Sequence, residues 1–359
     1  MSTSFYIWDA QKPDDFTAWE SLWKSWSSRE VFAHPAYGPL YQKPGVRFLC
    51  AAMITDDGSV LYPFYLRDLT CEDYCPARLG SIYDLCTPYG YGGPFCWESA
   101  DRAKLSEQFW FQFNAWATGQ SIVSEIIRFH LFPESLLPYP GEREELFRNI
   151  VCDLTPSEEE LWMRFEHKVR KNVKKAQRSN VTVIQDAKGD RLEEFLRIYY
   201  GTMERREASD SFFFEKEYFK QIEARLAGQW TYFHSIHEGR VISTELVLVS
   251  AENIYSFLGG TDASGYDLRP NDLLKYEIIR WAKQQGKKRF VLGGGYGGED
   301  GIFRYKQSFA PAGSVPFFIG KRILRNDLYQ QLVEAKKIAF VQSGQEWIPR
   351  ARFFPLYRA

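Results

Sequence analysis

Apolar residues along the first half of this chain alternate between helical and strand spacing, which predicts mixed α and β structure. The clearest helical stripe consists of Phe16, Trp19, Leu22, Trp23 and Trp26, which lie three or four positions apart. Asp56-Asp57-Gly58 separates two β-rich runs and is typical of a hairpin turn. The predicted elements are helices over 14–30 and 105–117 and strands over 47–55, 60–66 and 122–131.

The second half opens with a pattern typical of a helix start. Thr155 offers a capping hydroxyl, Pro156 suits the first helical position, and Glu158 makes the first turn acidic. The apolar stripe of this helix is Trp162, Phe165, Val169, Val173 and Ala176. The remaining predicted elements are strands over 181–185, 230–236, 241–249, 254–259, 288–292 and 317–320, and helices over 191–204, 218–227, 271–285 (capped by Asn271) and 326–341.

A glycine-rich stretch follows the predicted strand over 288–292. Six of the nine residues 293–301 are glycine, which argues against a helix there and predicts a long loop. Lys306 follows among aromatic residues. A backbone without side chains lets a ligand approach closely, and one fixed cation can stabilise the oxyanion of acyl transfer. An ordinary glycine-rich loop followed by a solvent-exposed lysine is the alternative.

Composition limits the classes of protein to consider. A length of 359 residues favours about two domains, and a net charge of −1 means that any phosphate or nucleic-acid contact must come from a local patch. Cys71 and Cys75 lack the second close pair that a zinc site needs, so we expect reduced thiols and no metal. No apolar run is long enough to span a membrane and no signal sequence is recognisable, which favours the cytoplasm.

Two further features carry charge suited to anions. Seven Lys or Arg residues lie between Arg164 and Arg178 with no acidic residue after Glu166, as expected for contact with phosphates or an RNA backbone. A solvated helix face is the alternative. Arg205 ends a predicted helix and could clamp a carboxylate or phosphate, or instead pair with Glu204 or Glu207. The attacking amine of an acyl transfer also needs a base, for which the candidates are Asp84, Asp262 and Glu299.

In combination these pieces resemble the Fem-type (FemABX) aminoacyltransferases, also described as tandem-GNAT or BioF2-like acetyltransferases. The matching stretches are residues 88–94 (Pro-Tyr-Gly-Tyr-Gly-Gly-Pro), 165–176, 202–205 and 293–309. The resemblance implies an α/β (α+β) fold with two tandem GNAT-like domains, each a mixed, mostly antiparallel sheet flanked by helices, and a cleft between them. No coiled-coil arm is expected, because residues 181–191 leave no room for one.

The expected division has three parts. Residues 1–150 form the first GNAT-like domain on the acceptor side, and residues 151–320 form the second, on the donor side, with the glycine loop. Residues 321–359 form a C-terminal helix and tail that pack back, with the first domain as the suggested partner.

The resemblance also implies an amide-forming acyltransferase that moves an aminoacyl group from aminoacyl-tRNA to an amine of a UDP-linked or lipid-linked muropeptide, or of another acceptor. It implies no metal, no cofactor and no DNA. Lys306 would support the donor carbonyl and its oxyanion, with Tyr305 beside it as the second catalytic candidate, and Arg205 would hold acceptor phosphates. The other substrate contacts would be Tyr89, Tyr91, Gly294, Gly295 and Tyr296. The tRNA or phosphate surface would be Lys168, Arg170, Lys171, Lys174 and Lys175.

Two alternative functions stay open at this point. The first is a GNAT N-acyltransferase that uses acetyl-CoA or another acyl-CoA in polysaccharide or natural-product synthesis. An acyl-CoA site of that fold needs a glycine-bearing loop before its helix, so that backbone amides reach the pyrophosphate. Residues 268–273 occupy that position here, and they contain no glycine and would turn an acid toward the pyrophosphate, which disfavours CoA. The second is a non-catalytic module that binds carbohydrate or RNA. The family's first-domain lysine has no secure counterpart, Lys43 being the nearest residue, and the oligomeric state is left open.

Overall fold

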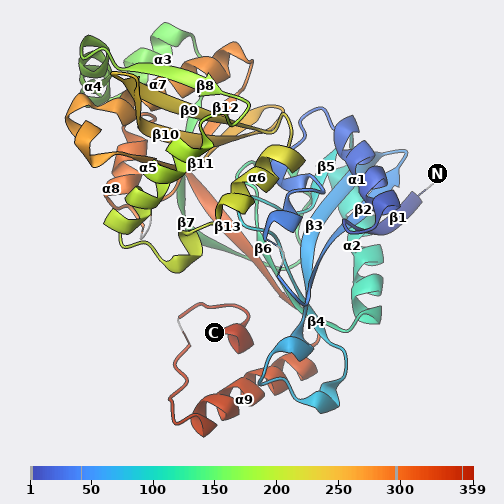
Figure 1. Ribbon diagram of the computed structural model, residues 1–359. Helices are drawn as coiled ribbons and strands as arrows, with labels where there is room; N and C mark the ends of the chain where they lie inside the picture. Colours follow the sequence, from blue (N-terminus) through green and yellow to red (C-terminus); the bar gives the residue numbers. More distant parts are fainter. Residues whose placement is uncertain (1–2, 42, 296–297, 350) are drawn as a thin grey trace. The chain divides into compact units, whose positions relative to one another are not determined.

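The chain forms two compact units, and each combines helices with a mostly antiparallel arrangement of strands (Figure 1). The computed structural model describes residues 3–41, 43–295, 298–349 and 351–359. Unit 1 comprises Met1–Trp26, Phe32–Leu146 and Phe317–Ala359, and unit 2 comprises Ser27–Val31 and Phe147–Pro316. The mixed α/β class expected from the sequence is confirmed, and the described residues include no coiled-coil arm. The predicted division at residues 150 and 320, and the predicted cleft between the domains, stay predictions.

Unit 1 is built on strands in the order β1-β2-β3-β4-β6-β13, with β5 beside β3. Neighbouring strands are antiparallel except for β4 and β6, which pair in parallel across the helix α2. The hairpin predicted at residues 56–58 joins β2 to β3, where Thr55 pairs with Gly58. The bounds are β1 (Thr3–Asp9), β2 (Val46–Thr55), β3 (Gly58–Asp68), β4 (Tyr83–Cys86), β5 (Phe95–Trp97), β6 (Ile122–Arg128) and β13 (Ser314–Ile323).

Aromatic side chains make up much of the core of unit 1. The helices α1 (Pro13–Ser25) and α2 (Arg102–Gly119) supply Trp19, Trp23 and Phe109 to it, all of which are buried. Each large apolar side chain that is fully buried stabilises the fold by about 1.5–3 kcal/mol. The high aromatic content of the sequence therefore serves the core.

The C-terminal helix α9 (Asn326–Gln342) and the final turn Leu356–Arg358 belong to unit 1. Tyr329, Leu332 and Tyr357 form a buried cluster with side chains that precede and follow β4. The unit therefore needs the last residues of the chain to complete one of its apolar clusters.

Unit 2 is built on strands in the order β7-β12-β11-β10-β9-β8. All neighbouring pairs are antiparallel except β11 and β12, which are parallel across the helix α7. The predicted three-strand meander is present as β9, β10 and β11. The bounds are β7 (Glu142–Asp153), β8 (Thr182–Asp186), β9 (Trp230–His237), β10 (Arg240–Val249), β11 (Asn253–Thr261) and β12 (Arg289–Gly293).

Helices cover both faces of the unit 2 sheet, as the alternation along β9 shows. Tyr232 contacts Phe195 of α5 with ring centroids 4.9 Å apart, whereas the next residue, Phe233, contacts Trp281 of α7 at 5.2 Å. α4 packs beside α7 (Figure 1). The bounds are α3 (Glu158–Arg164), α4 (His167–Arg178), α5 (Leu192–Arg205), α6 (Lys216–Arg225), α7 (Pro270–Gln284) and α8 (Gly301–Gln307).

Three local predictions about helices and loops were wrong, and the expected cap of α7, described with the site, was a fourth. The helix expected from Thr155 begins at Glu158 with Ser157 as its N-cap, because Ser157 and Glu160 form a reciprocal capping box. That helix then breaks at Phe165, which is extended (φ −65°, ψ 147°) and buries its ring against Phe309. The break leaves backbone carbonyl groups without helical partners. The Arg170 guanidinium donates hydrogen bonds to two of them, those of Met163 and Phe165.

The third error concerns the end of the glycine-rich stretch. Residues from Gly301 onward form the short helix α8, which starts where the Asp300 carboxylate accepts the backbone N–H of Phe303 at 2.8 Å. Lys306 therefore stands on a helix fixed by the buried Phe303 and not on a loop.

The segment Ser27–Val31 is joined to unit 2 by a buried carboxylate. Glu30 is 1% exposed and accepts hydrogen bonds from Asn253 Nδ2 at 2.5 Å and Tyr255 OH at 2.6 Å, while Val31 N–H donates to Ser250 Oγ. Burial raises the pKa of Glu30 to about 7. In the folded protein Glu30 keeps its proton up to about pH 7, whereas in the unfolded chain it loses the proton near its ordinary pKa of 4.5.

This proton makes the stability of the protein depend on pH. The contribution of Glu30 is fully present below about pH 4.5 and is lost as pH rises to about 7, because the folded pKa is the higher one. The loss amounts to about 3 kcal/mol for a shift of this size. The test is the difference in the free energy of unfolding between wild type and Glu30→Gln, measured by urea titration. We expect this difference to fall by about 3 kcal/mol between pH 4.5 and pH 7.5. Glu217→Gln, at an exposed site on α6, is the control; a flat difference for Glu30→Gln would contradict the prediction.

Candidate active site

A cavity of about 1100 Å³ lies in unit 2 where two parallel strands separate. β11 pairs with β12 only through Asn253, Ile254 and Tyr255, opposite residues 289–291. The remainder of β11 continues without β12, and its residues from Ser256 to Thr261 line the cavity. The other walls come from the end of α5, the start of α7, and α8. The backbone edge of β11 is therefore available to a ligand along this wall.

Lys306 reaches this cavity from α8. Its ammonium donates to the carbonyl oxygen of Gly294 at 2.6 Å, which leaves two of its three N–H bonds for other acceptors. Burial, and secondarily the charge of Lys275, lowers the pKa of Lys306 to about 8. Lys306 consequently carries its charge on roughly nine-tenths of molecules at pH 7. A fixed, partly desolvated cation at a cavity is suited to stabilising an oxyanion.

The glycines before α8 make room for the protein itself. Gly293 has φ +85°, and a Cβ there would lie 3.2 Å from Lys306 Nζ. A Cβ on Gly294 would lie 2.9 Å from the Arg148 carbonyl oxygen, and one on Gly295 would overlap the Asp300 carboxylate at 2.6 Å. Because these glycines have no side chains, Lys306 and Asp300 can approach the backbone. Contacts within the protein are therefore enough to explain the glycines, without the close approach of a ligand. Tyr296, the remaining predicted residue of this stretch, lies outside the described residues.

Tyr305 stands beside Lys306 and contacts the start of α7. Its hydroxyl accepts a hydrogen bond from Asn271 Nδ2 at 2.9 Å, and burial raises its pKa well above the ordinary value, so the phenol stays protonated. Asn271 was expected to cap α7, but Arg269 occupies that position in a left-handed conformation and Pro270 is the first helical residue. Tyr305 can therefore act only as a proton donor or hydrogen-bonding group at neutral pH.

Asp272 occupies the first turn of α7 and also lines the cavity. It is 7% exposed and accepts from Asn172 Nδ2 of α4 at 3.1 Å. Burial raises its pKa, against the opposing effects of the hydrogen bond from Asn172 and of the charges of Arg269 and Lys168. A phosphate at this helix start would therefore meet a carboxylate.

A buried ion pair between Lys275 and Glu245 forms the inner wall. Lys275 Nζ lies 2.5 Å from each carboxylate oxygen of Glu245 and 2.8 Å from Ser256 Oγ, with side-chain exposures of 6% and 5% for the pair. Sequence reasoning missed both residues. The available signal was a charged residue in the apolar run of β10 and another on the apolar face of α7.

Arg205 does not line the cavity itself but contacts three residues that do. It donates to the Thr261 carbonyl oxygen at 2.5 Å and to Thr202 Oγ1 at 3.1 Å, and its guanidinium carbon lies 5.8 Å from the Tyr266 ring centroid. Its side chain is exposed, and within the described residues it makes no ion pair with Glu204 or Glu207. The phosphate role for Arg205 stays a proposal, whereas the alternative ion pair is not formed.

The basic helix presents its charge to solvent. Lys168, Lys171, Lys174 and Lys175 are exposed on α4, whereas Arg170 is half-buried and serves the break after α3. The opposite face of α4 buries Val169, Val173 and Ala176. Since Asn172 binds Asp272 at the cavity, the basic face borders the candidate active site.

Tyr89 and Tyr91 belong to unit 1 and are not among the residues of this cavity. Tyr89 is 53% exposed, and its ring lies 5.6 Å from the guanidinium carbon of Arg128. Tyr91 packs its ring against Phe32 and Phe317, at 5.4 and 5.8 Å. Lys43 is exposed. Substrate contact by these residues stays a proposal.

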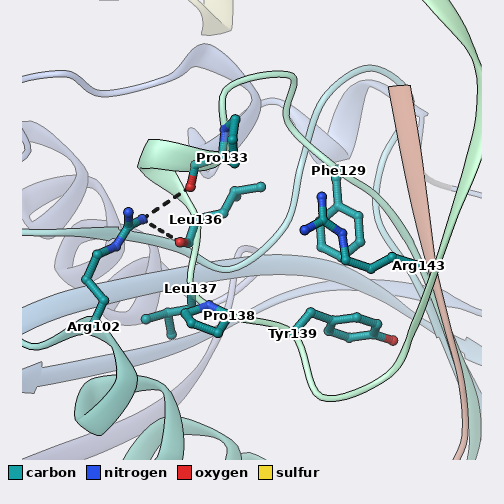
Figure 2. A pocket seen from close by; sticks show the side chains of 8 residues that line it. All are labelled: Arg102, Phe129, Pro133, Leu136, Leu137, Pro138, Tyr139 and Arg143. Atoms are coloured by element: carbon teal, nitrogen blue, oxygen red, sulfur yellow. Dashed lines mark hydrogen bonds between the residues drawn. The ribbon is translucent and has the colours of Figure 1, made fainter. Parts of the chain in front are cut away.

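A smaller pocket of about 320 Å³ lies elsewhere in unit 1 (Figure 2). Arg102 closes one side and donates to the carbonyl groups of Pro133 and Leu136. Arg143 lies across the ring of Phe129, 5.1 Å from its centroid. None of the residues predicted for the site from the sequence lines this pocket.

The three acids considered as general bases do not line the cavity. Asp84 is fully buried and is bound bidentately by Arg67 and Arg358. The hydrogen bond from Arg197 and those from Ser264 lower the pKa of Asp262 to about 2, which makes it a weak base. Glu299 is exposed outside the cavity. Asp272, by contrast, lines the cavity and has a raised pKa.

Among the residues that the structure describes, no three His, Cys, Asp or Glu side chains are grouped so as to hold a metal ion. All six cysteines are free. No described helix combines the length and the hydropathy needed to cross a membrane.

The comparison with protein families identifies the fold around this cavity. Residues 163–307 match the family described as an acetyltransferase (GNAT) domain. This stretch includes Lys306 and every residue of the cavity wall. Unit 2 therefore contains a GNAT domain, the fold class of acyltransferases, with the cavity at its strand split. The sequence has no significant match among curated proteins.

Solved structures show similarity over nearly the whole chain. FemX superposes with a TM-score of 0.67 at 13% identity and covers 92% of this chain and 99% of its own. A conserved protein of unknown function from Bacteroides thetaiotaomicron has a TM-score of 0.54 at 13% identity, with 89% and 99% covered. The DUF2156 domain of a proposed lysylphosphatidylglycerol synthetase from Agrobacterium fabrum has a TM-score of 0.51 at 12% identity, with 90% and 97% covered. The expected Fem-type, tandem-GNAT fold is thus confirmed.

Breaking the ion pair at the inner wall should destabilise the protein. Glu245→Gln leaves the Lys275 ammonium buried without a counter-charge, which costs about 3–5 kcal/mol. We expect this loss in the free energy of unfolding measured with urea, and recovery of most of it in the Glu245→Met, Lys275→Met double variant. Asp57→Asn breaks the exposed pair with Lys104, which solvent screens, and should cost far less stability than Glu245→Gln. Equal effects of Glu245→Gln and Asp57→Asn would show that the buried pair has no special weight.

Proposed function

We propose that the protein is an amide-forming acyltransferase whose chemistry takes place in the cavity of unit 2. Lys306 carries this proposal, because its ammonium is anchored by Gly294 and faces the split between β11 and β12. The GNAT domain across residues 163–307 supports acyl transfer as the reaction type. The fold shared with FemX supports an aminoacyl group as the acyl group, aminoacyl-tRNA as the donor, and an amine of a cell-wall precursor or related molecule as the acceptor.

The reaction we propose forms one bond and breaks another. The acceptor amine attacks the ester carbonyl carbon of the donor, and the carbonyl oxygen becomes an oxyanion stabilised by the Lys306 ammonium. The bond between the acyl carbon and the ribose oxygen then breaks as the amide forms. Asp272 is the proposed acceptor of the amine proton, since burial raises its pKa, and it returns that proton to the leaving oxygen, while the Tyr305 hydroxyl donates a hydrogen bond to the same oxygen.

The start of α7 favours aminoacyl-tRNA over acyl-CoA as the donor. Pro270 lacks an N–H group, and the buried Asp272 carboxylate lies in the first turn of the helix. A pyrophosphate bound there would meet a carboxylate in place of free amides, which costs free energy. The exposed lysines of α4 next to this point offer a surface for an RNA backbone instead.

Removing the Lys306 ammonium should slow turnover more than it weakens acceptor binding. We expect Lys306→Ala to lower kcat by about 10²–10³-fold with little change in KM, the usual effect of losing one oxyanion donor. In wild type, kcat should fall as pH rises through about 8, because the charged form is lost there. Lys306→Arg should keep its rate to higher pH.

Arg304→Ala is the matched control for Lys306→Ala. Arg304 is an exposed cation on the same helix, so its loss should leave kcat unchanged. Assays would supply aminoacyl-tRNA with a UDP-linked muropeptide, and in parallel acetyl-CoA with the same acceptor. Unchanged turnover in Lys306→Ala would remove the oxyanion role, and stabilisation of the protein by acetyl-CoA without any response to tRNA would replace the proposed donor.

Reversing two charges on α4 should weaken tRNA binding. Lys171→Glu with Lys174→Glu removes two phosphate contacts, so Kd should rise at least tenfold and the slope of log K against log salt should fall by about 2. Filter-binding titrations over a range of potassium chloride concentrations measure both quantities. Lys220→Glu with Lys337→Glu changes net charge equally at exposed positions on α6 and α9 and should leave the slope as in wild type. Identical slopes for the two double variants would mean that α4 is only a solvated face.

A further inference from the structure

Arg128 ends β6 at a place where the strands of unit 1 separate. β4 stops at Cys86, while β6 continues to Arg128, and the loop over residues 88–94 lies in place of a paired strand. Thr87 Oγ1 accepts from Arg128 N–H at 2.8 Å, and Gly92 N–H donates to the Arg128 carbonyl oxygen at 2.8 Å. Unit 1 thus repeats, in β4-α2-β6, the split that forms the cavity of unit 2 in β11-α7-β12.

The guanidinium of Arg128 lies among rings and keeps most of its donors free. Its central carbon is 5.0 Å from the Phe317 ring centroid and 5.6 Å from that of Tyr89. Arg128 Nε donates weakly to the Gly90 carbonyl oxygen at 3.4 Å. Within the described residues, neither terminal nitrogen has a hydrogen-bond or carboxylate partner, and neither is sealed from solvent. Contact with ring faces leaves the in-plane N–H groups of an arginine free to bind two oxygens at once.

Another arginine of unit 1 shows how such a charge is otherwise compensated. Arg322 also lies against aromatic rings, 4.8 Å from the Trp110 ring, yet its Nε is 3.0 Å from the carboxylate of Glu125. Among the residues that the structure describes, Arg128 has no comparable acid. Burial lowers its pKa, and the groups that oppose this effect are the side chains of Tyr89, Tyr91 and Tyr37, with no carboxylate among them. A partly desolvated charge without a counter-ion destabilises the folded chain.

The geometry points to an oxyanion-binding site at Arg128, where the guanidinium beside Tyr89 and Phe317 binds a carboxylate or phosphate group of a ligand through two parallel hydrogen bonds. The ligand supplies the counter-charge that the protein omits. The exposed ring of Tyr89 can cover an apolar part of the same ligand, and the contact of Nε with the Gly90 carbonyl oxygen leaves the terminal nitrogens for the ligand. This site belongs to unit 1, whereas Lys306 belongs to unit 2, and it does not depend on the transfer reaction.

Anion-dependent stabilisation of the full chain tests the site. Phenyl phosphate and benzoate would be titrated at constant ionic strength, with chloride as the balancing anion, and thermal unfolding and calorimetric binding would be recorded. We expect a saturable rise in Tm with at least one of the two. A response to phenyl phosphate identifies a phosphate site, and a response to benzoate identifies a carboxylate site. No response to either would overturn the proposal.

Variants at Arg128 connect the response to this residue. Arg128→Met should raise the Kd for the anion that stabilises wild type, phenyl phosphate or benzoate, at least tenfold. In chloride alone the Tm of this variant should be unchanged or higher, because the substitution removes an uncompensated charge. Arg128→Lys should bind with intermediate affinity, since it keeps the charge and loses the bidentate geometry. Arg143→Met, which also removes an arginine that contacts two rings, should bind as wild type does.

Three results would contradict the site. Arg128 would be a structural residue if Arg128→Met lowered Tm in chloride, and the anion would bind elsewhere if Arg128→Met kept the response or Arg143→Met lost it. Lys306→Ala should respond to the anion like wild type, so failure of the transferase assay and failure of this site are separate outcomes.

Discussion

The parallel strands β11 and β12 stay together for only three residue pairs, and the cavity of unit 2 depends on this separation. A strand edge released from its neighbour leaves N–H and C=O groups that must find other partners. Here the released part of β11 faces the cavity, and the chain after β12 turns away through Gly293 and Gly294. Because that turn brings the Gly294 carbonyl under Lys306, the same separation that opens the cavity also fixes its cation.

Charge without a partner distinguishes the surfaces of this protein that are open to ligands. Most buried acids and bases are matched internally, as in Lys275 with Glu245 and Asp84 with Arg358. Lys306, by contrast, is held by a neutral carbonyl group, and the lysines of α4 share one exposed face. An unmatched charge costs stability in the free protein, and proteins retain such costs mainly where a ligand is bound.

Patterns of apolar spacing were enough to place most of the elements, including the meander β9-β10-β11 and the helix α7. They failed where a tertiary contact overrides local preference. The helix predicted from Thr155 breaks because Phe165 turns into the core and Arg170 satisfies the freed carbonyl groups, and neither contact is visible in the spacing. Likewise Lys306 was found from its unusual neighbours, but Glu245 and Lys275 were missed because each looks, alone, like an exposed residue on an apolar element.

Unit 1 is assembled from pieces at both ends of the chain, and this has a consequence for biosynthesis. β6 pairs with β13, and α9 packs over the cluster around Leu69 and Val123, so Phe317–Ala359 must be present before unit 1 is complete. A ribosome synthesises those residues after the other segments of both units. Unit 2, apart from Ser27–Val31, is continuous and is fully synthesised earlier. During translation the C-terminal half of the protein can therefore fold first, while the aromatic residues of the N-terminal half wait with part of their core uncovered and exposed to chaperones.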